Sequence, residues 1–102
     1  MHQMVITDAG CAGRFGSLVM DAALTTEKPR QAERCAYYAS GACLDCVLAC
    51  PVAALDITAP YDREACWAQC LKNGNEFLDL GDDVQVCGKC AVSGPCSLES
   101  AV

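Results

Sequence analysis

The chain contains 102 residues, ten cysteines and a formal net charge of -6 at pH 7. This length fits one compact domain and excludes a multi-domain enzyme with a large substrate cavity of its own. Because only seven Lys and Arg are present, the chain is not expected to bind nucleic acid, whose phosphates need clustered cations. The negative balance fits a partner with a basic docking face.

The apolar side chains predict a thin core and no membrane span. Hydrophobic residues make up 53% of the sequence, but alanine and cysteine account for nearly half of them, so little large aliphatic surface is left for burial. No run of about 18 apolar residues exists, and the N-terminal residues lack the features of a signal peptide. We therefore expect a cytoplasmic chain, in which reduction keeps thiols free and dense cysteines favour metal or cluster ligation over disulfides.

Two segments are expected along the chain, together forming one compact unit. Residues 1–34 are interpreted as an N-terminal strand and linker segment, and residues 35–102 as the cysteine-rich domain. Within the first segment, the apolar runs 4–7 and 17–20 are separated by glycines and predict two short strands, paired as a hairpin or placed at an edge. Residues 25–34 contain a proline and several charges, which predicts an exposed linker.

Two helices are predicted in the second segment. Residues 46–55 favour a short helix, provided that Pro51 lies at its start or beyond its end. Residues 62–72 are the best helix candidate, because Asp62 can cap the N-terminus and Asn73-Gly74 is a common C-terminal stop. Residues 77–83 are expected to form an exposed acidic loop.

The cysteines after residue 34 fall into two groups. The first group has the pattern Cys35-x7-Cys43-x2-Cys46-x3-Cys50-Pro51. The second consists of Cys66 and Cys70 followed by Cys87-x2-Cys90-x5-Cys96. Bacterial ferredoxins hold [4Fe-4S] clusters through a C-x2-C-x2-C-x3-C-P run whose fourth cysteine ligates the other cluster. The first group has the last three cysteines of that run, with the remaining one displaced upstream.

This spacing assigns the thiols to two [4Fe-4S] clusters related by an approximate two-fold axis. A short x2 loop places two sulfurs on adjacent iron atoms and directs backbone N–H groups at the inorganic sulfides. The cysteine after the x3 step lies on the far side of a helical turn and serves the neighbouring cluster. The first cluster is then held by Cys35, Cys43, Cys46 and Cys96. The second is held by Cys50, Cys87, Cys90 and one of Cys66 or Cys70, of which we favour Cys66.

Eight ligands leave two cysteines over. Cys11 is the most isolated in the sequence, and we expect it to be a free thiol. The choice between Cys66 and Cys70 stays open, because the two lie four residues apart on the same face of a helix.

Zinc is the alternative to clusters. Cys43-x2-Cys46 and Cys87-x2-Cys90 would by themselves make a four-thiolate zinc site, and such sites also fold small domains with thin cores. The additional spaced cysteines and the Cys50-Pro51 step favour clusters instead. The sole histidine, His2, lies in a terminus that we expect to be frayed, so no histidine ligand is predicted.

Four stretches of the sequence carry a resemblance to a known family. They are Ile6-Thr7-Asp8-Ala9-Gly10 with the run from Arg14 to Asp21, then Cys35 to Leu55, Tyr61 to Cys66, and Cys87 to Cys96. Together they resemble the iron–sulfur region of the epoxyqueuosine reductase-like proteins and, more distantly, that of corrinoid reductive dehalogenases. In that family a double [4Fe-4S] domain of ferredoxin-like fold feeds electrons to a cobalamin bound by a larger domain.

The resemblance implies an α+β, ferredoxin-like fold with short helices and few strands, spanning residues 35–102 as a two-cluster domain. It implies the cluster ligands Cys35, Cys43, Cys46, Cys50, Cys66, Cys87, Cys90 and Cys96. No counterpart of the cobalamin-binding portion is present in these 102 residues. The chain is therefore expected to be an electron-transfer domain rather than a self-sufficient enzyme, and no catalytic residue is assigned to it.

The favoured function is electron transfer by two [4Fe-4S] clusters, as a carrier or as the electron-feeding part of a larger reductase. The expected partner is a redox protein, for which a cobalamin-binding reductase domain is a candidate, and neither nucleic acid nor a membrane is expected. Two alternatives remain open at this point. The chain could be a component of a split epoxyqueuosine reductase-like corrinoid enzyme, or a zinc-stabilised interaction module.

Overall fold

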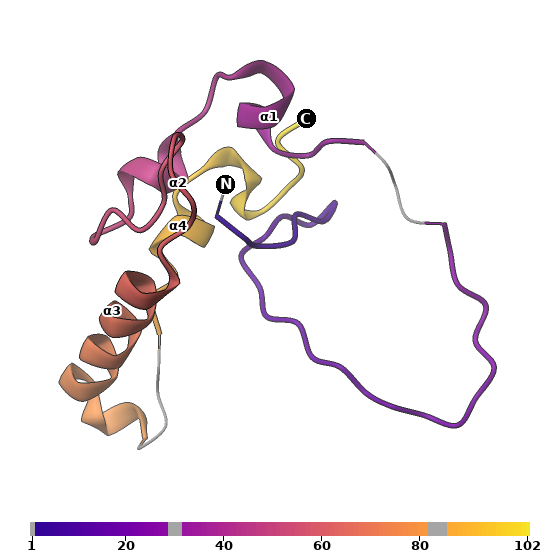
Figure 1. Ribbon diagram of the computed structural model, residues 1–102. Helices are drawn as coiled ribbons and strands as arrows, with labels where there is room; N and C mark the ends of the chain where they lie inside the picture. Colours follow the sequence, from indigo (N-terminus) through magenta and orange to yellow (C-terminus); the bar gives the residue numbers. More distant parts are fainter. Residues whose placement is uncertain (1, 29–31, 82–85) are drawn as a thin grey trace.

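The computed structural model describes residues 2–28, 32–81 and 86–102, which form a small domain of short helices joined by irregular segments (Figure 1). The α-helices are α1 (Ala36–Ser40), α2 (Asp45–Leu48), α3 (Arg63–Glu76) and α4 (Lys89–Val92). Two 3-10 helices, η1 (Leu78–Leu80) and η2 (Pro95–Ser97), complete the regular elements of the described ranges.

The two predicted strands do not form, so the α+β prediction is wrong for the described residues, which are mostly helix and coil. In the 4–7 run, only Thr7 enters a β-bridge, and its partner is Gly10 in the same tight turn. The 17–20 run is extended but unpaired, and Val19 is 98% exposed. Apolar, β-branched residues favour an extended backbone, but a strand also needs a neighbour to accept and donate its hydrogen bonds.

The helix predicted over 62–72 is confirmed as α3 and continues past Asn73-Gly74 to Glu76. The Asp62 carboxylate accepts a hydrogen bond of 2.9 Å from the Ala65 N–H, which is the predicted N-terminal cap. The helix predicted over 46–55 is shorter, because α2 ends at Leu48 and Pro51 lies beyond its end. Part of the predicted acidic loop is η1, while Asp82 and Asp83 lie outside the described residues.

The interior of the domain is small and lies where α2 packs against α4 and α4 packs against η2. Its buried cluster consists of Cys11, Ala91 and Cys96, with Ile6 and Ala101 partly buried against it. Four of its five members are alanine or cysteine rather than large aliphatic residues, and the fifth, Ile6, comes from the turn before Cys11. The expectation of a thin core is therefore met in the part of the chain that the structure describes.

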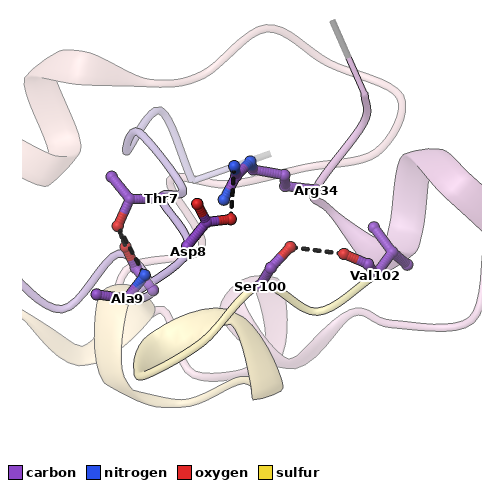
Figure 2. Close-up of polar contacts among 7 residues, drawn as sticks. Thr7, Asp8, Ala9, Arg34, Ser100 and Val102 are labelled. Atoms are coloured by element: carbon purple, nitrogen blue, oxygen red, sulfur yellow. Dashed lines mark hydrogen bonds and ion pairs between the residues drawn. The ribbon is translucent and has the colours of Figure 1, made fainter. Parts of the chain in front are cut away.

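The N-terminal residues fold back onto the C-terminal ones (Figure 1). The N–H of Cys11 donates to the carbonyl oxygens of Cys96, at 2.9 Å, and Ser97, at 3.1 Å. Gly10 makes this approach possible: its φ is +82°, and a Cβ at this position would collide with the backbone of Ser97. An ion pair of 2.7 Å between Asp8 and Arg34 also fastens this turn to the start of the cysteine-rich region (Figure 2).

Between these attachments, residues 12–28 form a long arm (Figure 1). It starts on the body of the domain, where the Ala12 N–H donates to the Ser97 carbonyl oxygen at 2.9 Å, and then extends away from it. All of its residues are exposed, and its apolar side chains include Phe15, Leu18 and Leu24, exposed by 68%, 82% and 67%. The linker predicted over 25–34 is exposed at residues 25–28, whereas the side chain of Arg34 is largely buried. Residues 29–31 lie outside the described ranges.

Candidate metal centre

All ten cysteines are free thiols, and none is more than partly exposed. Those at positions 11, 46 and 96 are buried, and the other seven are half-buried. Short elements present them: α1 begins directly after Cys35, α2 carries Cys46 and α3 carries Cys66 and Cys70. Gathered thiols without disulfides are the state in which cysteine binds metals, so the structure leaves the whole set available as ligands.

The Cys46 thiol feels the charges of three other thiols. Burial raises the pKa of the Cys46 thiol, and the charges of neighbouring thiols raise it further. Those neighbours are Cys35, Cys43 and Cys96. The four residues are the ones that the spacing assigns to the first cluster, and they come from both cysteine groups of the sequence.

A second set of thiols lines a cavity of about 40 Å³ between α3, α4 and the turn that follows α2. The cysteines in its wall are Cys50, Cys66, Cys87 and Cys90, and its other lining residues include Val52, Ala54 and Leu55. Burial raises the pKa of the Cys90 thiol, and the charges of the three other thiols raise it further. This set also mixes the two sequence groups, because Cys50 belongs to the first group and the other three cysteines belong to the second.

One sulfur in this cavity accepts a hydrogen bond from the backbone. The backbone N–H of Ala54 donates to the Sγ of Cys50 at 3.2 Å, because the chain turns tightly after Pro51. Such N–H donors to sulfur, together with low solvent access, stabilise cluster thiolates and tune their reduction potential.

Cys66 and Cys70 occupy different positions relative to this cavity. Cys66 lies in its wall, whereas Cys70 lies in a separate, open hollow beside Cys87. Tyr61, also in the cavity wall, is hydrogen-bonded to Cys66, and this bond, followed by burial, raises the pKa of Tyr61 to about 12. The thiol of Cys70 is still close enough for the charges of Cys66 and Cys87, after burial, to raise its pKa.

A third grouping, which the spacing does not predict, brings together His2, Cys11 and Cys96. The Nε2 of His2 lies 3.5 Å from the Sγ of Cys96 and 3.8 Å from that of Cys11, and the two sulfurs are 3.9 Å apart. All three residues are buried, and their ligand atoms lie within 4.8 Å of one another, so the group could hold a metal ion.

The expectation of a frayed terminus at His2 is therefore wrong, since this side chain is only 7% exposed. Burial lowers the pKa of His2, so its imidazole is neutral at pH 7. Cys11 is a free thiol, as expected, but it is not isolated in space: burial, followed by its hydrogen bond to Cys96, raises its pKa from 9.0 to about 11. No spacing rule could have found this group, because the turn at Gly10 is what brings the three side chains together.

Comparisons with protein-family models, with curated proteins and with solved structures found no match for the chain. Within the described ranges, no helix is long and apolar enough to cross a lipid bilayer. The case for a function therefore depends on the arrangement of the thiols themselves.

Proposed function

We propose that this chain is an electron-transfer module that carries two [4Fe-4S] clusters. The proposed ligands of the first are Cys35, Cys43, Cys46 and Cys96, and those of the second are Cys50, Cys66, Cys87 and Cys90. The observation that carries the proposal is the cavity lined by the second set, because Cys50 reaches it from the first sequence group. This exchange of one cysteine between groups is the pattern by which bacterial ferredoxins hold paired clusters.

The same observation weighs against a single structural zinc site. A four-thiolate zinc site built from the two C-x2-C pairs would need Cys43 and Cys46 to converge with Cys87 and Cys90. The cavity that Cys87 and Cys90 line is shared instead with Cys50 and Cys66. The thiols whose charges act on Cys46 are those of Cys35, Cys43 and Cys96. Two sets of four thiols fit two clusters better than they fit one tetrahedral ion.

The protein's own residues would hold, shield and tune the clusters, which would supply one-electron chemistry when bound. Val52, Ala54 and Leu55 form apolar walls beside the second set. The N–H of Ala54 is a donor to a ligand sulfur. Each oxidised [4Fe-4S] cluster with four thiolates carries about two negative charges. Together with the net charge of -6, this supports a redox partner with a basic docking face.

The exposed arm favours the second candidate, in which the chain feeds electrons to a corrinoid on a larger protein. Residues 12–28 include Phe15, Leu18 and Val19, which are exposed to solvent within the described chain. Apolar side chains on an extended, unpaired segment are typical of a segment that packs on another chain or domain. An electron carrier and an electron-feeding domain of a corrinoid protein would hold the same clusters and would differ only in the electron acceptor.

Anaerobic purification with iron, sulfide and zinc counting tests the proposal. We expect about eight irons and eight sulfides per chain, a brown colour and a reduced-state EPR spectrum of two interacting clusters. A colourless protein with about one zinc per chain would refute the proposal of two clusters. Reduction of cobalamin by the pre-reduced protein, followed by its absorbance, then separates the second candidate from a carrier with another acceptor.

Substitutions of single cysteines test which residues hold each proposed cluster. Cys46→Ala and Cys90→Ala are expected to remove one cluster each, which leaves about four irons per chain. Cys11→Ala is the matched control, because Cys11 is as buried as Cys46 but is not a proposed ligand. Loss of iron in this control equal to that in the ligand variants would contradict the assignment.

A further inference from the structure

His2 is the one histidine of the chain, and it lies next to residues of both proposed cluster sites. Its Nε2 is 3.5 Å from the Sγ of Cys96, a proposed ligand of the first cluster. The same side chain forms part of the wall of the cavity that the second set of thiols lines. A polar ring that is only 7% exposed needs hydrogen-bond partners, and these partners define what it can do.

The backbone decides which ring nitrogen carries the proton. The N–H of Met4 donates to Nδ1 of His2 at 3.1 Å, so Nδ1 is an acceptor and has no hydrogen of its own. In a neutral imidazole the proton is then on Nε2, the nitrogen that faces the sulfurs. A protonated Nε2 has no lone pair for a metal, so this tautomer makes His2 a hydrogen-bond donor rather than a ligand.

Two donors converge on the sulfur of Cys96. The first is Nε2–H of His2, and the second is the thiol of Cys11, which donates to the same sulfur at 3.9 Å. The Cys11 thiol also lies 3.5 Å from the carbonyl oxygen of Ala91, so its single hydrogen is shared between this oxygen and the Cys96 sulfur, which makes it the weaker of the two donors. This arrangement suits Cys96 as a thiolate acceptor and gives the non-ligand Cys11 a role beside it.

We propose that His2 donates a hydrogen bond to the Cys96 thiolate and thereby raises the reduction potential at the first cluster site, with Cys11 as a weaker second donor. This inference rests on the proposed function, since it needs a cluster bound by Cys96. One-electron reduction adds a negative charge that is shared with the ligand sulfurs. A donor at the sulfur therefore stabilises the reduced form more than the oxidised form.

The test is a potentiometric titration of the loaded full-length chain, followed by EPR. His2→Phe keeps a ring of similar size and removes the donor, so we expect the potential of one cluster to become more negative by at least 59 mV. This shift equals a tenfold change in the ratio of oxidised to reduced cluster for one electron. His2→Gln, whose amide N–H can replace the donor, is expected to recover most of the shift, and Cys11→Ala to give a smaller shift of the same sign.

Gln3→Asn is the matched control, because Gln3 is the exposed neighbour of His2 and asparagine tolerates its φ of +58°. We expect the control to keep the wild-type potential. Electron–nuclear double resonance of the reduced protein should show an exchangeable proton coupling that disappears in His2→Phe and remains in the control. This readout responds to the hydrogen bond and not to packing.

The outcomes separate this inference from the function on which it rests. A wild-type protein without iron defeats the proposed function. A His2→Phe variant with about eight irons, unchanged potentials and an unchanged proton coupling defeats only the inference. The wild-type protein could also contain a metal ion in addition to the irons of the proposed clusters. Loss of that ion in both His2→Phe and Cys11→Ala would show that His2, Cys11 and Cys96 form a separate metal site, and this result would overturn the donor role of His2. Should His2→Phe fail to assemble, an unshifted potential in Cys11→Ala together with a missing proton coupling in the wild type also overturns it.

Discussion

Removal of the clusters is expected to unfold the domain, because the polypeptide alone buries too little apolar surface. The chain exposes 7840 Å², whereas a compact protein of its mass, 10.7 kDa, exposes about 5,500 Å². Its radius of gyration is 15.9 Å, against about 13 Å for a compact domain of this length. The excess surface of about 2,300 Å² measures the burial that the fold lacks.

The free energy that corresponds to this surface is large. With about 57% of it apolar and about 25 cal/mol per Å², the missing hydrophobic stabilisation is about 30 kcal/mol. If half of the excess belongs to the exposed arm, which need not be ordered, the remaining ~15 kcal/mol still matches the whole net stability of an ordinary domain. We therefore expect the free energy of ligating the proposed clusters to supply what the core does not.

Circular dichroism during heating and urea titration measures the effect. The loaded protein is expected to show one cooperative transition, and the protein stripped by a chelator under anaerobic, reducing conditions to show none. Reloading with iron and sulfide should restore the transition, which controls for damage during stripping. A stripped protein with a cooperative transition and a urea m value above about 1 kcal/mol/M would refute the reasoning.

Three further substitutions test separate parts of the structure. Cys66→Ala is expected to lower the iron count from about eight to about four per chain, because Cys66 lines the cavity. Cys70→Ala is expected to keep about eight irons. Equal iron counts in the two variants would contradict the assignment of Cys66 as the ligand. Gly10→Ala is expected to lower the melting temperature, because the added Cβ would collide with the backbone of η2. Gly13→Ala is the control and should keep the wild-type melting temperature, because a Cβ there meets nothing within 4 Å. Equal melting curves for the two variants would show that the turn at Gly10 is not needed for stability. Asp62→Ala removes the cap of α3 and is expected to cost about 1 kcal/mol in urea denaturation of the loaded protein, and an unchanged midpoint would show that the cap contributes nothing.

Sequence reasoning succeeded where a short-range rule decides the structure. The N-terminal cap at Asp62 needs only a side chain and an N–H three residues later, so α3 begins where it was predicted. The division of the thiols into two sets of four was also inferred from spacing, because a cluster imposes its own dimensions on the loops that hold it, and this division stays a prediction. The pocket around Cys50, Cys66 and Cys90 supports that inference, while the identity of the bound group stays a prediction.

Sequence reasoning failed where contacts between segments far apart in the chain determine the structure. The run at residues 17–20 has the composition of a strand, but whether a strand forms depends on a partner that composition does not reveal. His2 was placed in a frayed terminus, because position in the chain was the only information about it. Its burial follows from the turn at Gly10 and from the hydrogen bonds between Cys11 and η2, which link residues more than eighty positions apart.

The core of this domain and the proposed metal centre share side chains. Its buried apolar residues, within the described ranges, are Cys11, Cys46, Ala54, Leu55, Ala91 and Cys96. Leu55 is the single large aliphatic side chain among them, and it lines the cavity of the second set of thiols. Two of the three buried cysteines are proposed ligands, and the third hydrogen-bonds to one of them. A substitution at Cys46 or Cys96 is therefore expected to remove packing and a proposed ligand at once, so stability and the proposed redox function should change together at these positions.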